Sequence, residues 1–106
     1  MHTIQNINEE ATRIFGTSRT TLFLEILKNW ISEKEEIISF KIDRKNDRVL
    51  VLTFKDNGQP KDHFSYEEDY KLTRFFPMGE KWEASIDYSG QTAREMMEKL
   101  LKDVCL

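Results

Sequence analysis

Residues 38–54 read ISFKIDRKNDRVLVLTF, and their apolar side chains recur with a period of two. In the first part, polar residues alternate with Ile38, Phe40 and Ile42. This alternation predicts a half-buried strand. After a polar turn at residues 44–47, residues 49–54 form a second strand that is apolar on both faces. Such a strand is either central in a sheet or meets a partner on one face. A homodimer would supply that partner if the outward side chains are Val49, Val51 and Thr53.

Two more strand-like segments and a helix follow toward the C-terminus. Residues 70–76 are strand-like, with a less regular start at residues 63–66. Another turn at residues 77–80 leads into a clean alternation over residues 82–88. For the last helix, a capping box is predicted from Thr92 and Glu95. Helical spacing then joins Ala93, Met96, Met97, Leu100, Leu101 and Val104.

The segment before residue 38 has a helical period instead. Asn8 is expected to cap a first helix that begins at Glu9, and Gly16 offers a left-handed stop. Ser18 is expected to cap a second helix that runs to about Lys34. One broad face of that helix carries Leu22, Phe23, Ile26, Leu27, Trp30 and Ile31.

This order predicts an α+β fold. Two helices precede a three- to four-stranded antiparallel sheet, and a C-terminal helix packs on one face of the sheet. We expect the helices mainly on one face. The chain has 106 residues, 39% of them hydrophobic and 33% charged. These values fit a single compact domain over residues 1–106.

Composition excludes several classes of protein. The net charge of −3 argues against a broad footprint for nucleic acid or anionic lipid. One Cys excludes an internal disulfide, and two His leave too few ligands for a metal cage. We therefore predict no metal and no cofactor. The chain shows no secretory leader and no apolar run long enough to span a membrane, which favours the cytoplasm.

Residues 10–27 read EATRIFGTSRTTLFLEIL. Four features of this stretch match a known structural unit. They are the pair Ala11-Thr12, the apolar Ile14-Phe15, the turn at Gly16 and the opening of the second helix at residues 18–22. This unit resembles the helix-turn-helix of bacterial and phage regulators, although no family resemblance extends over the whole chain. The resemblance implies DNA binding by residues 8–34. It would place five residues at the DNA, the last two as a wing tip: Ser18, Arg19, Thr20, Arg44 and Lys45.

An acidic segment is the other candidate site. Three carboxylates lie between two tyrosines, and together they form the predicted partner-binding set: Tyr66, Glu67, Glu68, Asp69 and Tyr70. Such a cluster could dock a basic protein surface, because Tyr provides contact area at low entropic cost. With His63 it could alternatively hold a metal or an acid–base pair. Adjacent strand residues point to opposite faces, so a solvated loop tip is favoured over that chemistry.

No catalytic constellation is evident, and we predict a non-enzyme. The leading hypothesis is a small acidic protein-binding module, such as an inhibitor, immunity or accessory protein of a phage or mobile element. It rests on the acidic balance, the two-sided strand and two apolar residues placed for docking, Phe23 and Leu24. The alternative is a helix-turn-helix DNA-binding regulator. We place it second because residues 8–31 carry three basic and three acidic side chains.

Overall fold

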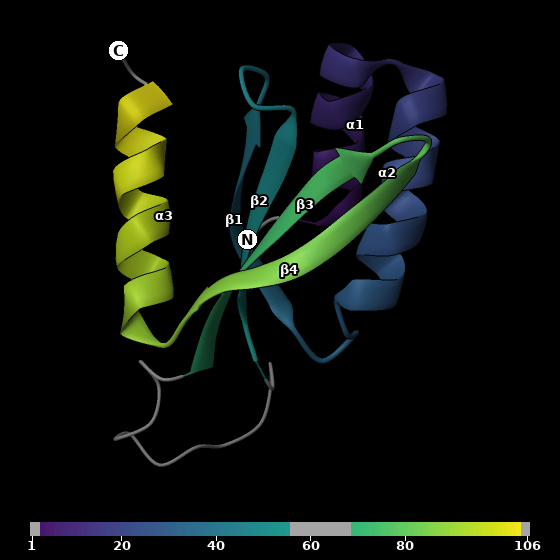
Figure 1. The fold of residues 1–106 in the computed structure, drawn as a ribbon. Helices are drawn as coiled ribbons and strands as arrows, with labels where there is room; N and C mark the ends of the chain where they lie inside the picture. Colours follow the sequence, from purple (N-terminus) through teal and green to yellow (C-terminus); the bar gives the residue numbers. More distant parts are fainter. Residues whose placement is uncertain (1–2, 56–68, 105–106) are drawn as a thin grey trace.

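The computed structural model describes residues 3–55 and 69–104, and it confirms the predicted α+β fold (Figure 1). Two N-terminal helices, a four-stranded antiparallel sheet and a C-terminal helix follow one another along the chain. The elements are α1 (Ile4–Phe15), α2 (Thr17–Trp30), β1 (Glu36–Asp43), β2 (Arg48–Phe54), β3 (Tyr70–Met78), β4 (Lys81–Ser89) and α3 (Gln91–Val104). The strand start expected at residues 63–66 lies outside the described residues. In the described ranges, no helix is long and apolar enough to cross a bilayer.

The sheet is an antiparallel meander in the order β1-β2-β3-β4. A turn at residues 44–47 joins β1 to β2, and Asp47 takes a positive φ of 51° there. Gly79 and Glu80 join β3 to β4, and Gly79 has a φ of 64°. Positive φ at the first residue of a two-residue hairpin loop lets the loop follow the twist of the strands. Both turns lie at positions that the sequence predicts, and β4 is left at one edge.

Helices cover both faces of the sheet (Figure 1). Side chains alternate along β2, so that Val49 and Val51 pack with residues of α1 and α2, whereas Leu50 and Leu52 pack with α3. The expectation of helices mainly on one face is wrong, because β2 is apolar on both faces and each face needs a cover. Val49, Val51 and Thr53 are fully buried within the chain. These three side chains need no second copy of the chain to cover them, so they no longer favour a homodimer.

An aromatic cluster joins α2 to the sheet. The ring of Phe23 meets that of Phe75 edge-on, with centroids 5.5 Å apart, and that of Trp82 at 5.1 Å. Edge-to-face pairs add to the free energy gained by burial. Phe23 is fully buried and Leu24 packs against the same core, so neither has the free docking position that was expected of it.

The starts of the helices differ from the sequence prediction. Thr3, rather than Asn8, caps α1 through a capping box with Asn6. Gly16 precedes α2, so Ser18 lies inside that helix, which ends at Trp30 rather than near Lys34. Thr92 lies inside α3 and does not cap it. The chain turns earlier because the amide of Gly90 donates to the carbonyl of Tyr70 over 2.8 Å, and Gly90 in turn accepts from the amide of Ala93.

Candidate functional site

The predicted partner-binding set is described only in part. Tyr66, Glu67 and Glu68 lie outside the described residues, and Asp69 directly precedes β3. The Tyr70 ring packs edge-on against Phe54 at 5.3 Å, and its hydroxyl accepts a hydrogen bond from Arg94 over 3.3 Å. Tyr70 therefore has a structural role where β2, β3 and α3 meet. Docking through residues 66–70 stays a prediction.

The residues proposed for DNA contact fall into different environments. Ser18 is exposed at the start of α2, whereas Thr20 is 1% exposed and faces the core with Phe23. Arg44 and Lys45 are exposed in the β1–β2 turn. A single residue, Gly16, separates α1 from α2. The DNA-binding alternative also stays a prediction.

Arg19 is held by three neighbours. Its guanidinium lies over the rings of Phe15, at 5.1 Å, and Trp82, at 5.5 Å. Nη2 also lies 3.4 Å from a carboxylate oxygen of Asp47. These contacts link the start of α2 to the β1–β2 turn. They also turn the Asp47 carboxylate toward the helices.

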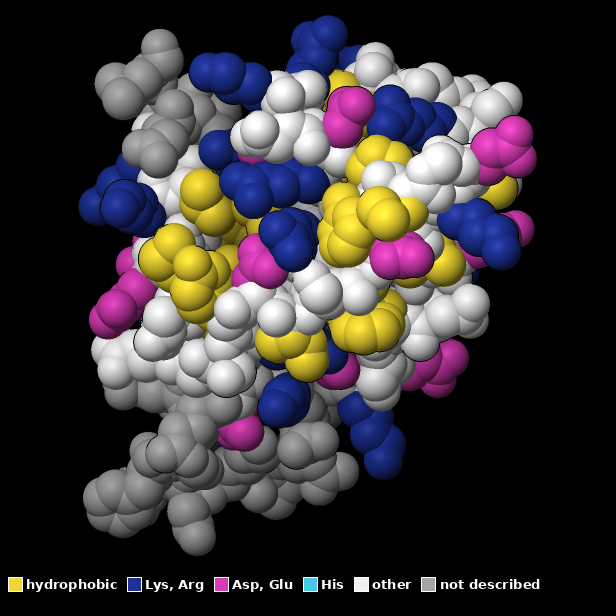
Figure 2. All heavy atoms as spheres, in the orientation of Figure 1, with side chains coloured by type: hydrophobic (Ala, Val, Ile, Leu, Met, Phe, Trp, Pro, Cys, Tyr) yellow, Lys and Arg dark blue, Asp and Glu magenta, His cyan; other side chains and the backbone are white. Residues whose placement is uncertain are grey.

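Apolar side chains gather beside β4 on the surface of the protein (Figure 2). Residues four apart lie on one side of a helix, so Leu22, Ile26 and Trp30 form a line along α2. A hollow lined by both Leu22 and Trp82 shows that this side of α2 meets β4. Ile86 shares a face of the strand with Trp82 by the period of two. We name four of these residues the edge strip: Leu22, Ile26, Trp30 and Ile86.

The place of Trp30 on the broad apolar face of the second helix predicts a core residue, and this prediction is wrong. Trp30 is 40% exposed, and Ile86 is 55% exposed. The helical period alone puts Trp30 near the buried face, but β4 runs obliquely away from the last turn of α2 (Figure 1). The edge strip is therefore left open. Beyond it, no described strand pairs with the outer side of β4.

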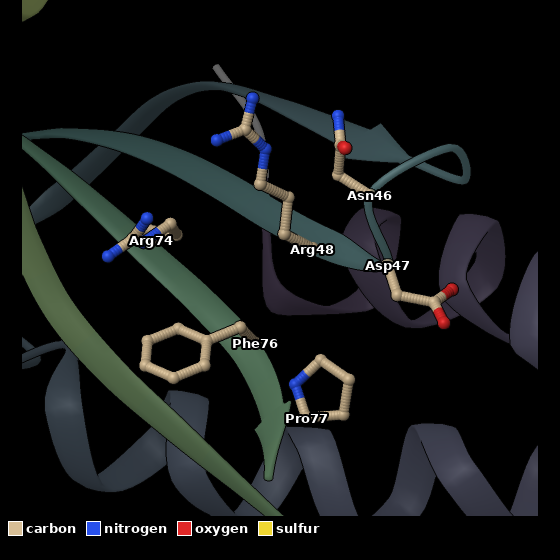
Figure 3. Close-up of a pocket in the computed structure, with 6 residues that line it drawn as sticks. All are labelled: Asn46, Asp47, Arg48, Arg74, Phe76 and Pro77. Carbon is tan, nitrogen blue, oxygen red and sulfur yellow. The ribbon is translucent and has the colours of Figure 1, made fainter.

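A second candidate site lies on the opposite face of the sheet (Figure 3). It is an open hollow of about 580 Å³, lined by Asn46, Asp47, Arg48, Arg74, Phe76 and Pro77. We name it the arginine hollow. Arg74 pairs with Leu50 across the strands, and Arg48 precedes Leu50 by two, so both arginines lie on the α3 side of the sheet.

This hollow was not predicted from the sequence. The basic residues near the β1–β2 turn are diluted in sequence by Asp43 and Asp47, which favours a solvated turn. Arg74 lies 26 positions after Arg48, and only the register of β2 with β3 makes them diagonal neighbours. The strand register, which the sequence alone does not give, is the information needed to predict that the two arginines lie close together.

Asp43 organises the β1–β2 turn. Its carboxylate accepts hydrogen bonds from the amides of Lys45 and Asn46, from Asn46 Nδ2 at 2.9 Å and from Arg48 Nε at 3.1 Å. Burial of the carboxyl raises its pKa. Hydrogen bonds from Asn46 and Arg48 outweigh that effect and hold the pKa of Asp43 below its ordinary value of 3.8. The ionised carboxylate therefore stabilises the fold.

We expect Asp43→Asn to lower the free energy of unfolding by about 1–2 kcal/mol at neutral pH, through loss of charge-assisted hydrogen bonds. Because the folded pKa lies below 3.8, the contribution of Asp43 is complete above pH 3.8 and disappears as the pH falls through the folded pKa. Urea unfolding of both proteins at several pH values measures this. A difference that stays constant down to the acid limit would contradict it.

No protein-family model, curated protein or solved structure matches this chain. Within residues 3–55 and 69–104, no group of three or more His, Cys, Asp or Glu side chains is placed to hold a metal ion. The two candidate sites are therefore judged on their own geometry.

Proposed function

We propose that this chain is a small, non-enzymatic protein-binding module of the cytoplasm, an inhibitor, immunity or accessory protein that docks on a larger protein. The observation that carries the proposal is the edge strip, in which three large apolar side chains are 40–55% exposed beside β4, whose outer side pairs with no described strand. Single exposed apolar residues are ordinary, but neighbouring ones are typical of interaction sites.

The unpaired side of β4 defines the chemistry of the partner. An edge strand presents a row of backbone donors and acceptors, and an extended segment of another protein can pair with them. Such a segment would place alternate side chains over the edge strip. The partner is therefore one that supplies an extended, partly apolar segment, and β4 is nine residues long on this side.

Charge around the edge strip also favours a protein over nucleic acid. The charges beside the edge strip are the exposed Glu25 on α2 and three residues that line a hollow together with Leu22, namely Arg19, Glu80 and Lys81, so that two are of each sign. Nucleic-acid binding draws most of its non-specific affinity from several Lys and Arg at the phosphates. A balanced surface that carries an aromatic side chain is more typical of a protein interface.

The test compares Ile86→Lys with a matched control. Met78 is 54% exposed, close to the 55% of Ile86, but lies outside the edge strip, so Met78→Lys places the same charge elsewhere. Tagged wild-type and Met78→Lys proteins should retain one stoichiometric protein from the source cell. For the purified pair, Ile86→Lys should weaken binding by about tenfold or more, because truncated or charged anchors cost over 1 kcal/mol.

Equal affinity of the Ile86→Lys and wild-type proteins would overturn the assignment of the edge strip. A gel shift with duplex DNA tests the alternative function. Salt-sensitive binding that Arg19→Ala abolishes, without a stoichiometric protein partner, would overturn the proposal in favour of a DNA-binding regulator.

A further inference from the structure

The arginine hollow holds two guanidinium groups, each with at least one Nη atom that has no polar partner among the described residues. Arg48 meets Asp43 only through Nε, at 3.1 Å. Arg74 lies with its guanidinium over the Phe76 ring, at 5.1 Å from the centroid. Among the described residues, 3–55 and 69–104, neither Nη atom of Arg48 has a polar partner, and Nη1 of Arg74 has none either. Figure 3 shows both side chains rising from neighbouring strands into the hollow.

The carboxylates nearby do not occupy the hollow. Asp47 lines it, but its carboxylate points away from both arginines (Figure 3) and lies 3.4 Å from Arg19. Asp43 has its charge divided among the turn amides, Asn46 and Arg48. Asp87 Oδ1 lies 3.4 Å from Arg74 Nε, so each arginine meets its carboxylate neighbour through Nε and not through its Nη groups.

Arg74 is only loosely held. Its Nε lies 3.4 Å from Asp87 Oδ1, is buried and makes no hydrogen bond. Its Nη2 reaches Ser85 Oγ only at 3.5 Å. Hydrogen bonds between charged groups are ordinarily nearer 2.8 Å. The side chain, 40% exposed, is therefore positioned by packing on Phe76 and keeps most of its donor capacity for another group.

We propose that the arginine hollow binds an oxyanion, a phosphate or carboxylate group, between Arg48 and Arg74. The planar guanidinium presents paired N–H donors that match two oxygens of such a group. Arg48 and Arg74 occupy diagonal positions on adjacent strands and both line the hollow, so an anion bound there would meet both forks. This site lies on the α3 face of the sheet and is independent of the edge strip.

Titration followed by ¹⁵N NMR tests the proposal. Inorganic phosphate and acetate are added in separate experiments, with sodium chloride at matched ionic strength as the reference. We expect saturable shifts at residues lining the hollow with a dissociation constant in the millimolar range. Arg48→Ala and Arg74→Ala should each weaken binding by about tenfold. Tighter binding of phosphate identifies a phosphorylated ligand, and tighter binding of acetate identifies a carboxylate ligand.

Two further variants make the result specific. Arg13 is also paired with a carboxylate, Glu10, but lies on α1, so Arg13→Ala should leave the shifts unchanged. Arg74→Lys keeps the charge and the aliphatic stem of the side chain but loses the planar fork, so it should also weaken binding. This variant provides the test if Arg74→Ala fails to fold. Non-saturating shifts equal to those in sodium chloride, or equal losses in Arg13→Ala and Arg74→Lys, would overturn the proposal.

Discussion

Phe23→Ala is expected to lower the free energy of unfolding by about 3–5 kcal/mol, the range for removing a buried aromatic ring. Phe23 is fully buried and its ring contacts both Phe75 and Trp82. The substitution removes the largest of the buried contacts between α2 and the sheet and leaves a cavity between them. Domains of this size are stable by about 5–15 kcal/mol, so the variant approaches the unfolding threshold. Urea or thermal unfolding followed by circular dichroism measures the loss.

Leu22→Ala is the matched control for this prediction. Leu22 precedes Phe23 on the same helix but is 44% exposed. Its truncation should cost about 0.5–1 kcal/mol, because little apolar surface returns to water and no cavity forms. Similar losses in the two variants would mean that α2 does not depend on the aromatic cluster. The same comparison separates the stability of the fold from binding, because Leu22 belongs to the edge strip.

Local periodicity predicted most of the secondary structure. Strand β2 shows why this worked, since an apolar run between two polar turns has few other solutions. It also shows where prediction stopped. The sequence predicts that both faces of β2 need a cover, but not that α1 and α2 take one face while α3 takes the other. That choice depends on contacts between elements far apart in the chain.

The candidate sites were harder to predict than the fold. Trp30 has the helical position of a core residue and is exposed only because β4 diverges from α2. Arg74 and Arg48 share a hollow only through strand register. Side-chain direction also mattered, because Asp47 dilutes the basic residues around Arg48 in the sequence but pairs with Arg19 in the fold. Each case needs tertiary geometry that composition and spacing do not contain.

Lys71→Met is the other substitution with a large expected effect. Lys71 Nζ donates to Glu35 Oε1 over 2.8 Å, and the two side chains are only 10% and 12% exposed. Oε2 of Glu35 is buried without a hydrogen bond, so this carboxylate depends on Lys71. Removing one partner of a buried pair leaves an uncompensated charge and costs about 3–5 kcal/mol. We expect that loss in urea unfolding at neutral pH.

The double variant Lys71→Met/Glu35→Leu decides between charge and packing as the cause. If the cost of Lys71→Met comes from the stranded carboxylate, removing Glu35 as well should restore most of the lost stability, because an apolar pair of similar volume can replace a buried ion pair. The double-mutant cycle should then show a coupling energy of about 3 kcal/mol or more, because each single substitution strands a charge and the double substitution strands none. Additive losses would mean that Lys71 stabilises the sheet through its aliphatic stem alone, since its charge would then have no measurable partner.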